Sequence, residues 1–215
     1  TEVAAVAEAA GQLGVKRDDV AKFTKVMLDL GVATNLTAEE GATSIRQFMN
    51  IMGSAPASVD RIGSAIVGLG NNSATTERDI VNMAQRLAAA GKQANMSEAD
   101  VLGMAAAMAS VGIEAEAGGT AMSLTLKQID GMVREGGAKL ELLGQISGTS
   151  AAEFAAAWGA DAAQAMDSLI VGFGEMGASG EDVNAVLDEL GFKGIRQSDT
   201  LLRLSGATRA MGGEV

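Results

Sequence analysis

Carboxylates are the side chains of this sequence best suited to chemistry, because imidazole, thiol and phenol groups are all missing. The chain contains no His, no Cys and no Tyr. Without His there is no imidazole base, and without Cys there is no thiolate nucleophile, thiolate metal ligand or disulfide. Paired acids, which glycosidases need, occur at Glu39–Glu40, Glu114/Glu116 and Glu181–Asp182. Each pair falls in the first turn of an expected helix, where acids favour the positive helix end, so we interpret all three as structural.

Glycine motifs are the second chemical signal. Residues 172–177, GFGEMG, match Gly-x-Gly-x-x-Gly. A dinucleotide-binding loop must follow a strand and open a helix, whereas these glycines close a helical pattern. Gly118–Gly119–Thr120 fits an anion-binding nest or the close packing of two helices, and we favour packing. Trp158 could stack on a ligand, but we expect it to anchor the core. We therefore expect no catalytic residue, no cofactor and no metal.

The composition describes an acidic protein with a core of small side chains. The chain has 215 residues and a net charge of −11, with 40 Ala, 28 Gly and 3% aromatic residues. This charge disfavours DNA and anionic membranes, whose phosphates attract clustered Lys and Arg. The longest apolar uncharged run, residues 101–113, is shorter than the ~20 residues of a spanning helix. No secretory leader is visible, and the opening Thr1 leads us to expect part of a longer or processed product.

Helix starts and stops recur along the chain. A Ser, Thr, Asp or Asn precedes an acid, an Ala/Leu/Met-rich stretch and a Gly, which is the chemistry of helix caps. Capping boxes are predicted at Thr37–Glu40, Ser97–Asp100, Ser150–Glu153 and Ser179–Asp182. Apolar residues at three- and four-residue spacing predict further helices over 20–30, 56–69, 76–90, 114–134, 138–146, 160–176 and 199–211.

The expected fold class is all-α, with about ten to twelve short-to-medium helices in hairpins joined by Gly/Ser/Asn loops. The Gly- and Ser-rich stretch 136–150 is the weakest point of the pattern. It separates an N-terminal helical subdomain, residues 1–135, from a C-terminal one, residues 138–215, unless both form one continuous domain. Residues 190–197 are the best non-helical candidate, with Ile195 docking a loop. The cap–helix–Gly unit recurs, but no exact sequence repeat does.

Four segments, in order, resemble the conserved core of phage tail tape measure proteins. Residues 37–57 look like a Thr-x-Glu-Glu-Ala helix, and residues 96–129 resemble a small-residue helix followed by Gly112–Ile113 and Gly119–Thr120. Residues 146–176 match an aromatic segment through Phe154, Trp158 and Leu169. Residues 186–204 match a closing Leu-Gly-x-x-Gly-x-Arg element through Gly191 and Gly194, with Phe192 in place of an aliphatic residue.

This resemblance implies a virion structural protein that sets tail length, scaffolds tail-tube assembly inside the lumen and leaves ahead of the genome. It implies a homo-oligomer, with a trimer favoured over a hexamer. It also implies contacts with tail tube proteins, tail tip proteins and a tail assembly chaperone. Specific nucleic-acid binding is not expected, whereas contact with the host membrane could accompany ejection. The location implied is the tail lumen, and the host cytoplasm during assembly.

Two other functions stay open at this point. One is a peptidoglycan-cleaving domain that acts through a lone acid such as Glu153, which would need a perturbed pKa in a cleft. The other is a membrane-active helical module that inserts residues 101–113.

The motif residues also predict specific packing. Phe154 and Trp158 lie four apart, so they should be buried together on one helix face. Helices 98–111 and 120–134 should form an antiparallel hairpin through Ala105, Ala109 and Ala121, with Gly119 in a link over 114–119. The frequent glycines lead us to expect a segment folded back into a compact domain rather than one long helix.

Overall fold

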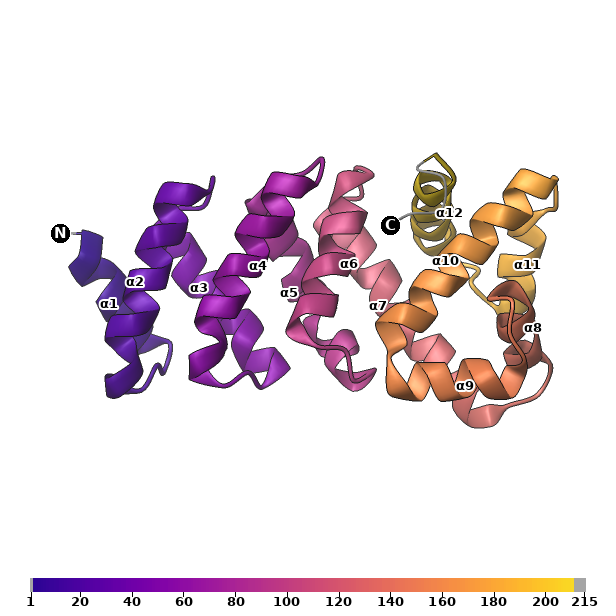
Figure 1. Ribbon diagram of the computed structural model, residues 1–215, viewed down its shortest axis with the longest axis horizontal. Coiled ribbons are helices and arrows are strands. Elements are labelled where there is room, and N and C mark those ends of the chain that lie inside the picture. The colour runs from indigo at the N-terminus through magenta and orange to yellow at the C-terminus, as the bar shows by residue number, and fades with distance from the viewer. Residues whose placement is uncertain (1, 211–215) are drawn as a thin grey trace.

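Twelve α-helices and one short 3-10 helix make up residues 2–210, the part of the chain that the computed structural model describes (Figure 1). No strand occurs among these residues, so the all-α prediction is confirmed. The helices are α1 (Glu2–Gln12), α2 (Arg17–Ala33), α3 (Ala38–Met52), η1 (Pro56–Ser58), α4 (Val59–Asn72), α5 (Glu77–Gln93), α6 (Glu98–Ser110), α7 (Ala115–Glu135), α8 (Ala138–Ile146), α9 (Ala151–Ala160), α10 (Ala162–Ser179), α11 (Val183–Leu190) and α12 (Ile195–Ala210). The last helix was expected over 199–211; it begins four residues earlier, and residue 211 lies outside the described part.

Capping side chains begin three helices where the sequence predicted capping boxes. Thr37, Ser97 and Ser150 each accept a hydrogen bond from a backbone N–H three residues on, and the acid there accepts one in return. The box predicted at Ser179–Asp182 is wrong. Helix α10 runs through Ser179, Gly180 ends it in a left-handed conformation, and Asp182 alone caps α11.

The first seven helices form one row that is two layers deep. Helix α4 packs on α2 and on α6 in one layer, while α3 packs on α1 and α5, and α5 on α7, in the other. Figure 1 shows this row running from α1 at one end towards α7. The chain folds back at each loop, and the resulting two-helix units stack side by side. The segment is therefore folded back rather than one long helix, and each unit buries its apolar faces against the next one along the row.

The stacked hairpins carry an internal repeat that the sequence analysis missed. Val20, Val59 and Val101 occupy the same position of α2, α4 and α6, 39 and 42 residues apart. From each Val, the same spacing leads to apolar or small residues: Phe23, Thr24, Met27, Leu30; Ile62, Gly63, Ile66, Leu69; and Met104, Ala105, Met108, Val111. The second helices α3, α5 and α7 begin after Thr37, Thr76 and Glu114, and bury the same five positions after that residue. Two-helix units of about forty residues, each packed on its neighbours, define an α-solenoid.

Helix α12 closes the row. It packs between α7 and α10, and α10 in turn contacts α6 (Figure 1). Gln197 on α12 is 2% exposed, and its amide donates to the Thr125 hydroxyl at 2.9 Å and to the Gln128 side-chain oxygen at 2.6 Å, both on α7. One hydrophobic cluster runs from Val6 to Leu204. The division into subdomains 1–135 and 138–215 stays a prediction; Gly136 and Gly137, both with positive φ, mark the point where the stacked units end.

The prediction that helices 98–111 and 120–134 form an antiparallel hairpin is wrong, because they do not pack extensively on each other. Helices α6 and α7 both pack along α5 instead. The predicted link is also too long, because α7 begins at Ala115 and includes Gly119. The prediction failed because adjacent helices were assumed to pair, whereas the second helix of each solenoid unit stacks on the second helix of the previous unit.

An ion pair joins the second helices of two neighbouring units. The Arg78 guanidinium on α5 donates to both carboxylate oxygens of Glu40 on α3, at 2.6 and 2.9 Å, and to the Asn35 carbonyl oxygen at 2.8 Å. Glu40 also accepts from the backbone N–H and hydroxyl of Thr37. The Arg78 hydrogen bond, followed by those from Thr37, lowers the pKa of Glu40 to about 2.

The Glu40→Gln variant should therefore lose stability in a pH-dependent way. Because the folded pKa of Glu40 lies below its ordinary value of 4.5, its contribution is present above about pH 4.5 and is lost as pH falls towards 2. Urea unfolding at pH 7 should show a lower midpoint for Glu40→Gln than for the unchanged protein, and the difference should vanish near pH 2. Glu39→Gln, which removes the same charge from a neighbouring position, is the control. Equal losses in both variants would contradict the role of the ion pair.

Candidate functional site

The motif residues of the central segment lie at the turn into α7 and in its first two turns. Gly112 has φ 72°, which ends α6 in a left-handed residue, and half-buried Ile113 follows. The backbone N–H of Ile113 donates to the Met108 carbonyl oxygen at 3.2 Å. Exposed Thr120 donates its hydroxyl proton to the Glu116 carbonyl oxygen within α7, at 2.8 Å. These residues shape the α6–α7 connection. They do not form an anion nest, because residues 118–120 lie inside α7, where the Gly118 backbone N–H donates to the Glu114 carbonyl oxygen at 2.8 Å.

Gly118 and Gly119 let α7 approach its neighbours. A Cβ on Gly118 would overlap the Ile113 side chain and lie 3.1 Å from the Met108 methyl carbon. A Cβ on Gly119 would overlap the Cβ of Arg86 on α5. Both glycines are buried, so this pair serves close helix packing, the interpretation favoured from the sequence.

The Gly119→Val variant should be destabilised by about 1–3 kcal/mol. The added side chain meets Arg86 next to its backbone, where little can move, so α5 and α7 must separate. Gly131→Ala in the same helix is the matched control. A Cβ there meets no atom within 4 Å, and replacing a helix glycine by alanine should stabilise by about 0.5–1 kcal/mol. Chemical unfolding followed by circular dichroism measures both, and unchanged stability in Gly119→Val would show that the α5–α7 contact yields without cost.

The closing motif residues form the connection between α11 and α12. Gly191 ends α11 with φ 94°, and its carbonyl oxygen accepts from the Gln128 side-chain amide at 3.5 Å. Phe192 is fully buried, whereas Gly194 is exposed and its carbonyl oxygen accepts the first hydrogen bond of α12 from the Ser198 N–H. Ile195, expected to dock a loop, is instead 89% exposed at the start of α12. The buried anchor of this segment is Phe192.

The aromatic motif residues are core residues. Phe154 and Trp158 lie on one face of α9, are 1% and 4% exposed, and place their ring centroids 6.2 Å apart. The prediction that they are buried together is confirmed. Leu169, on α10, is fully buried. Burial of the indole fits an anchor of the core, as expected.

Two surface hollows border the motif segments. A polar cleft of about 510 Å³ lies between α5 and the turn into α7, lined by Asp79, Asn82, Arg86, Gly112 and Glu114 among others. Its carboxylates, amides and guanidinium can form hydrogen bonds with a polar ligand or peptide. Gly112 and Ile113 were predicted from the sequence as motif residues, whereas the α5 residues were not, because only the stacking of α5 on α7 brings them close.

An apolar groove of about 700 Å³ lies where α6 meets α4, α10 and α12. Met104, Ile170 and Leu204 line it, together with Asp167, whose pKa is raised by burial. Sequence reasoning missed this groove, although the signal was there: the longest apolar run, 101–113, is apolar on more sides than a helix with one buried face needs.

Glu153 does not have the properties that an acid catalyst requires. It is exposed, and hydrogen bonds from the backbone N–H and then the hydroxyl of Ser150 lower its pKa. A general acid in a glycosidase needs a raised pKa instead. Within residues 2–210, no group of three or more acidic side chains is arranged to hold a metal ion. In the same range, no helix has both the length and the apolar character needed to cross a membrane.

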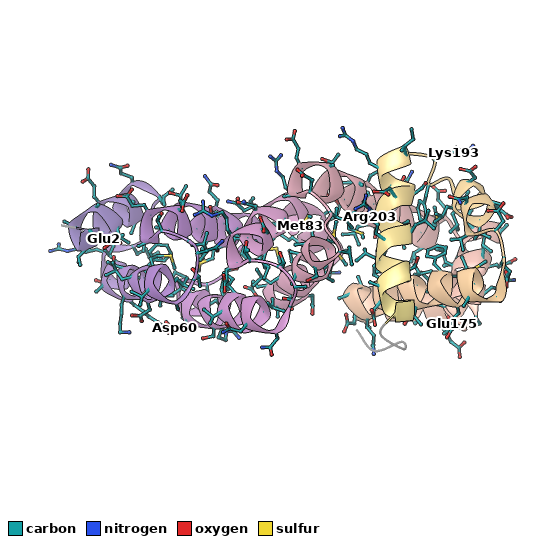
Figure 2. The ribbon with its side chains drawn as sticks, turned by 90° about the horizontal axis from the view of Figure 1, so that it is seen from above. Glu2, Asp60, Met83, Glu175, Lys193 and Arg203 are labelled. Atoms are coloured by element: carbon teal, nitrogen blue, oxygen red, sulfur yellow. The ribbon has the colours of Figure 1, made fainter. Side chains whose placement is uncertain are left out.

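Figure 2 shows the distribution of side chains in this architecture. Met83 lies in the interior between the two layers, while Glu2, Asp60, Glu175 and Arg203 lie on the outside. Stacked two-helix units with charged outer faces define the class of helical repeat proteins.

The chain belongs to the phage-related minor tail protein family, whose model matches residues 1–150. The match covers every stacked unit and α8. No curated protein matches the chain. Family membership makes this a structural protein of the phage tail, located in the tail of the virion.

Proposed function

We propose that this chain is part of a tape measure protein, which sets tail length, templates tail-tube assembly from within the lumen and leaves ahead of the genome. The observation that carries the proposal is the stack of repeated two-helix units in a chain of the minor tail protein family. The ordered resemblance of four segments to tape measure proteins supports it. The chain acts as a scaffold without chemistry or a cofactor of its own.

The proposed partners follow from the same role. The chain assembles with further copies of itself, with a trimer favoured over a hexamer. It contacts tail tube proteins, tail tip proteins and, in the host cytoplasm, a tail assembly chaperone. Its charge of −11 repels DNA, so a lumen occupant of this kind does not retain the genome behind it. It binds no specific nucleic acid, and it contacts the host membrane only on ejection.

The folded stack contributes little length to a ruler. A continuous helix gains about 1.5 Å per residue, so forty residues span about 60 Å. A stacked unit of the same size advances by one helix-to-helix spacing, about 8–10 Å. We therefore propose that this part is a docking or assembly domain at one end of the ruler rather than a measured stretch.

Deleting residues 35–205 in frame from the phage gene tests this role. As a docking domain, its loss should abolish tail assembly or tip attachment in electron micrographs. Intact tails shortened by about 255 Å would show instead that the segment lies stretched as helix in the tube. Normal tails of unchanged length would overturn the tape measure function.

A smaller deletion, of residues 55–96, distinguishes a folded segment in the tail from a stretched one. It joins Ser54 to Ser97, which takes the repeat position of Ala55, so the remaining units stay in register. A stretched segment would shorten the tail by about 63 Å, whereas a folded one would change it by about 10 Å at most.

A further inference from the structure

The row of hairpins begins with half a unit. Helix α1 ends as α3 and α5 do: left-handed Gly14, Gly53 and Asn95 each stand three residues before the next helical element, which is α2, η1 and α6 in turn. At each of these ends, the next backbone N–H donates to a carbonyl oxygen five residues back, in the pairs Val15–Ala10, Ser54–Met49 and Met96–Gly91, at 2.9–3.0 Å. Helix α1 is thus a second helix, equivalent to α3, α5 and α7.

The burial pattern of α1 confirms this equivalence. Its buried residues Val6 and Ala10 occupy the positions of Ile45 and Met49 in α3, 39 residues on. The same two positions are buried in α5, as Ala84 and Ala88, and in α7, as Met122 and Leu126.

Three of the five shared positions depart from this pattern in α1, since Glu2 and Val3 are exposed and Ala9 is half-buried. Val3 is 54% exposed, whereas its equivalents Ala42, Val81 and Gly119 are all buried. In α7 this position meets the previous second helix, because a Cβ on Gly119 would touch Arg86 of α5. In α5, the side-chain amide of Gln85, one helical turn after Val81, donates to the Ser44 carbonyl oxygen of α3 at 3.1 Å. Val3 therefore lies on the face that stacks on a preceding unit.

The first layer is open at the same end. Asp60 of α4 pairs with Lys22 of α2 at 2.5 Å, so this position faces the preceding first helix. Its equivalent in α2, Ala21, is exposed. Figure 2 places Glu2, the start of α1, at the left end of the molecule, while α12 occupies the opposite half.

We propose that the exposed α1–α2 face is a stacking surface for one more two-helix unit of the same repeat. The occupant has a first helix with the pattern Val-x-x-apolar-small-x-x-apolar-x-x-apolar and a second helix that covers Val3. The continuity of the α3–α5–α7 and α2–α4–α6 stacks identifies this occupant, since each existing unit covers the next at these positions. The proposal concerns the stack alone and does not rest on the tape measure function.

A tandem duplication of residues 1–39 tests the surface. Residue 39 of the added copy then precedes Thr1, which takes the repeat position of Glu40. Hydrogen exchange of the original α1 amides should slow by about tenfold or more, because α1 becomes an internal helix. The thermal midpoint should rise by about 4 °C or more.

Two variants control the test. The same duplication carrying Phe23→Ser, Met27→Ser and Leu30→Ser in the added copy only should leave α1 exchange unchanged. Val3→Asp in the original copy should abolish the gain of the duplicated chain, but have little effect without the duplication. Unchanged α1 exchange in the duplicated chain would overturn the proposal. A dimer of the 215-residue chain in sedimentation that Val3→Asp dissociates would overturn it too, because the occupant would be a second copy of this end.

Discussion

The Gly172→Ala variant is expected to lose about 3 kcal/mol or more of unfolding free energy. Gly172 lies inside α10, where the helix crosses the end of α8. A Cβ at this position would overlap the carbonyl oxygen of Ile146 and lie 2.8 Å from its carbonyl carbon. These are backbone atoms, so no side chain can rotate away to make room.

Gly177→Ala is the matched control in the same helix. A Cβ on Gly177 would lie 3.6 Å from the Val183 side chain, an ordinary contact, so this variant should be neutral or slightly stabilised. Urea unfolding of both variants by circular dichroism gives the comparison. If Gly172→Ala unfolds at the same urea concentration as Gly177→Ala, α10 can move off α8 without cost, and this account of the glycine motif is wrong.

The Trp158→Ala variant is the second large loss that we expect, roughly 3–5 kcal/mol. Trp158 is the only Trp of the chain, it is 4% exposed, and it stacks on Phe154. Its neighbours along α9 are mostly Ala, so little can collapse into the cavity that the indole leaves.

The Trp158→Phe variant separates cavity formation from loss of the aromatic ring, and it should cost clearly less than Trp158→Ala. Native fluorescence gives an independent check, because the buried indole should emit at shorter wavelength than the urea-unfolded chain. A native maximum at the wavelength of exposed Trp would contradict the burial on which the prediction depends.

Local signals in the sequence were enough to find most helices and several caps. The predicted helix 138–146 matches α8 residue for residue, and Pro56 begins a helical turn as expected. Cap chemistry is readable in this way because the side chain and the backbone N–H that it satisfies lie within three residues of each other.

Packing partners were not readable, because they depend on residues far apart in the chain. Gly53 was predicted correctly as a helix stop. Gly172 was predicted to close a helix and Gly119 to lie in a link, whereas both of them, like Gly91, lie inside helices. At these three positions glycine is needed because a neighbouring segment packs too close for a Cβ, and the local sequence does not indicate which segment that is. The repeat escaped notice for a similar reason: one position takes Phe23, Ile62 or Met104, which share only their apolar character.

The interlock of α12 with α7 makes the molecule resist force differently at its two ends. In the stacked row, each hairpin is held mainly by the hairpin next to it, so a pull on residue 2 loads one interface at a time and peels the units in sequence. A pull on residue 210 first loads α12, which is held by α7, α10 and the buried amide of Gln197 together. The chain is therefore expected to respond differently to force at its two ends: its units should separate one after another from the first helix, whereas α12 should stay in place until its contacts with α7 and α10 break together.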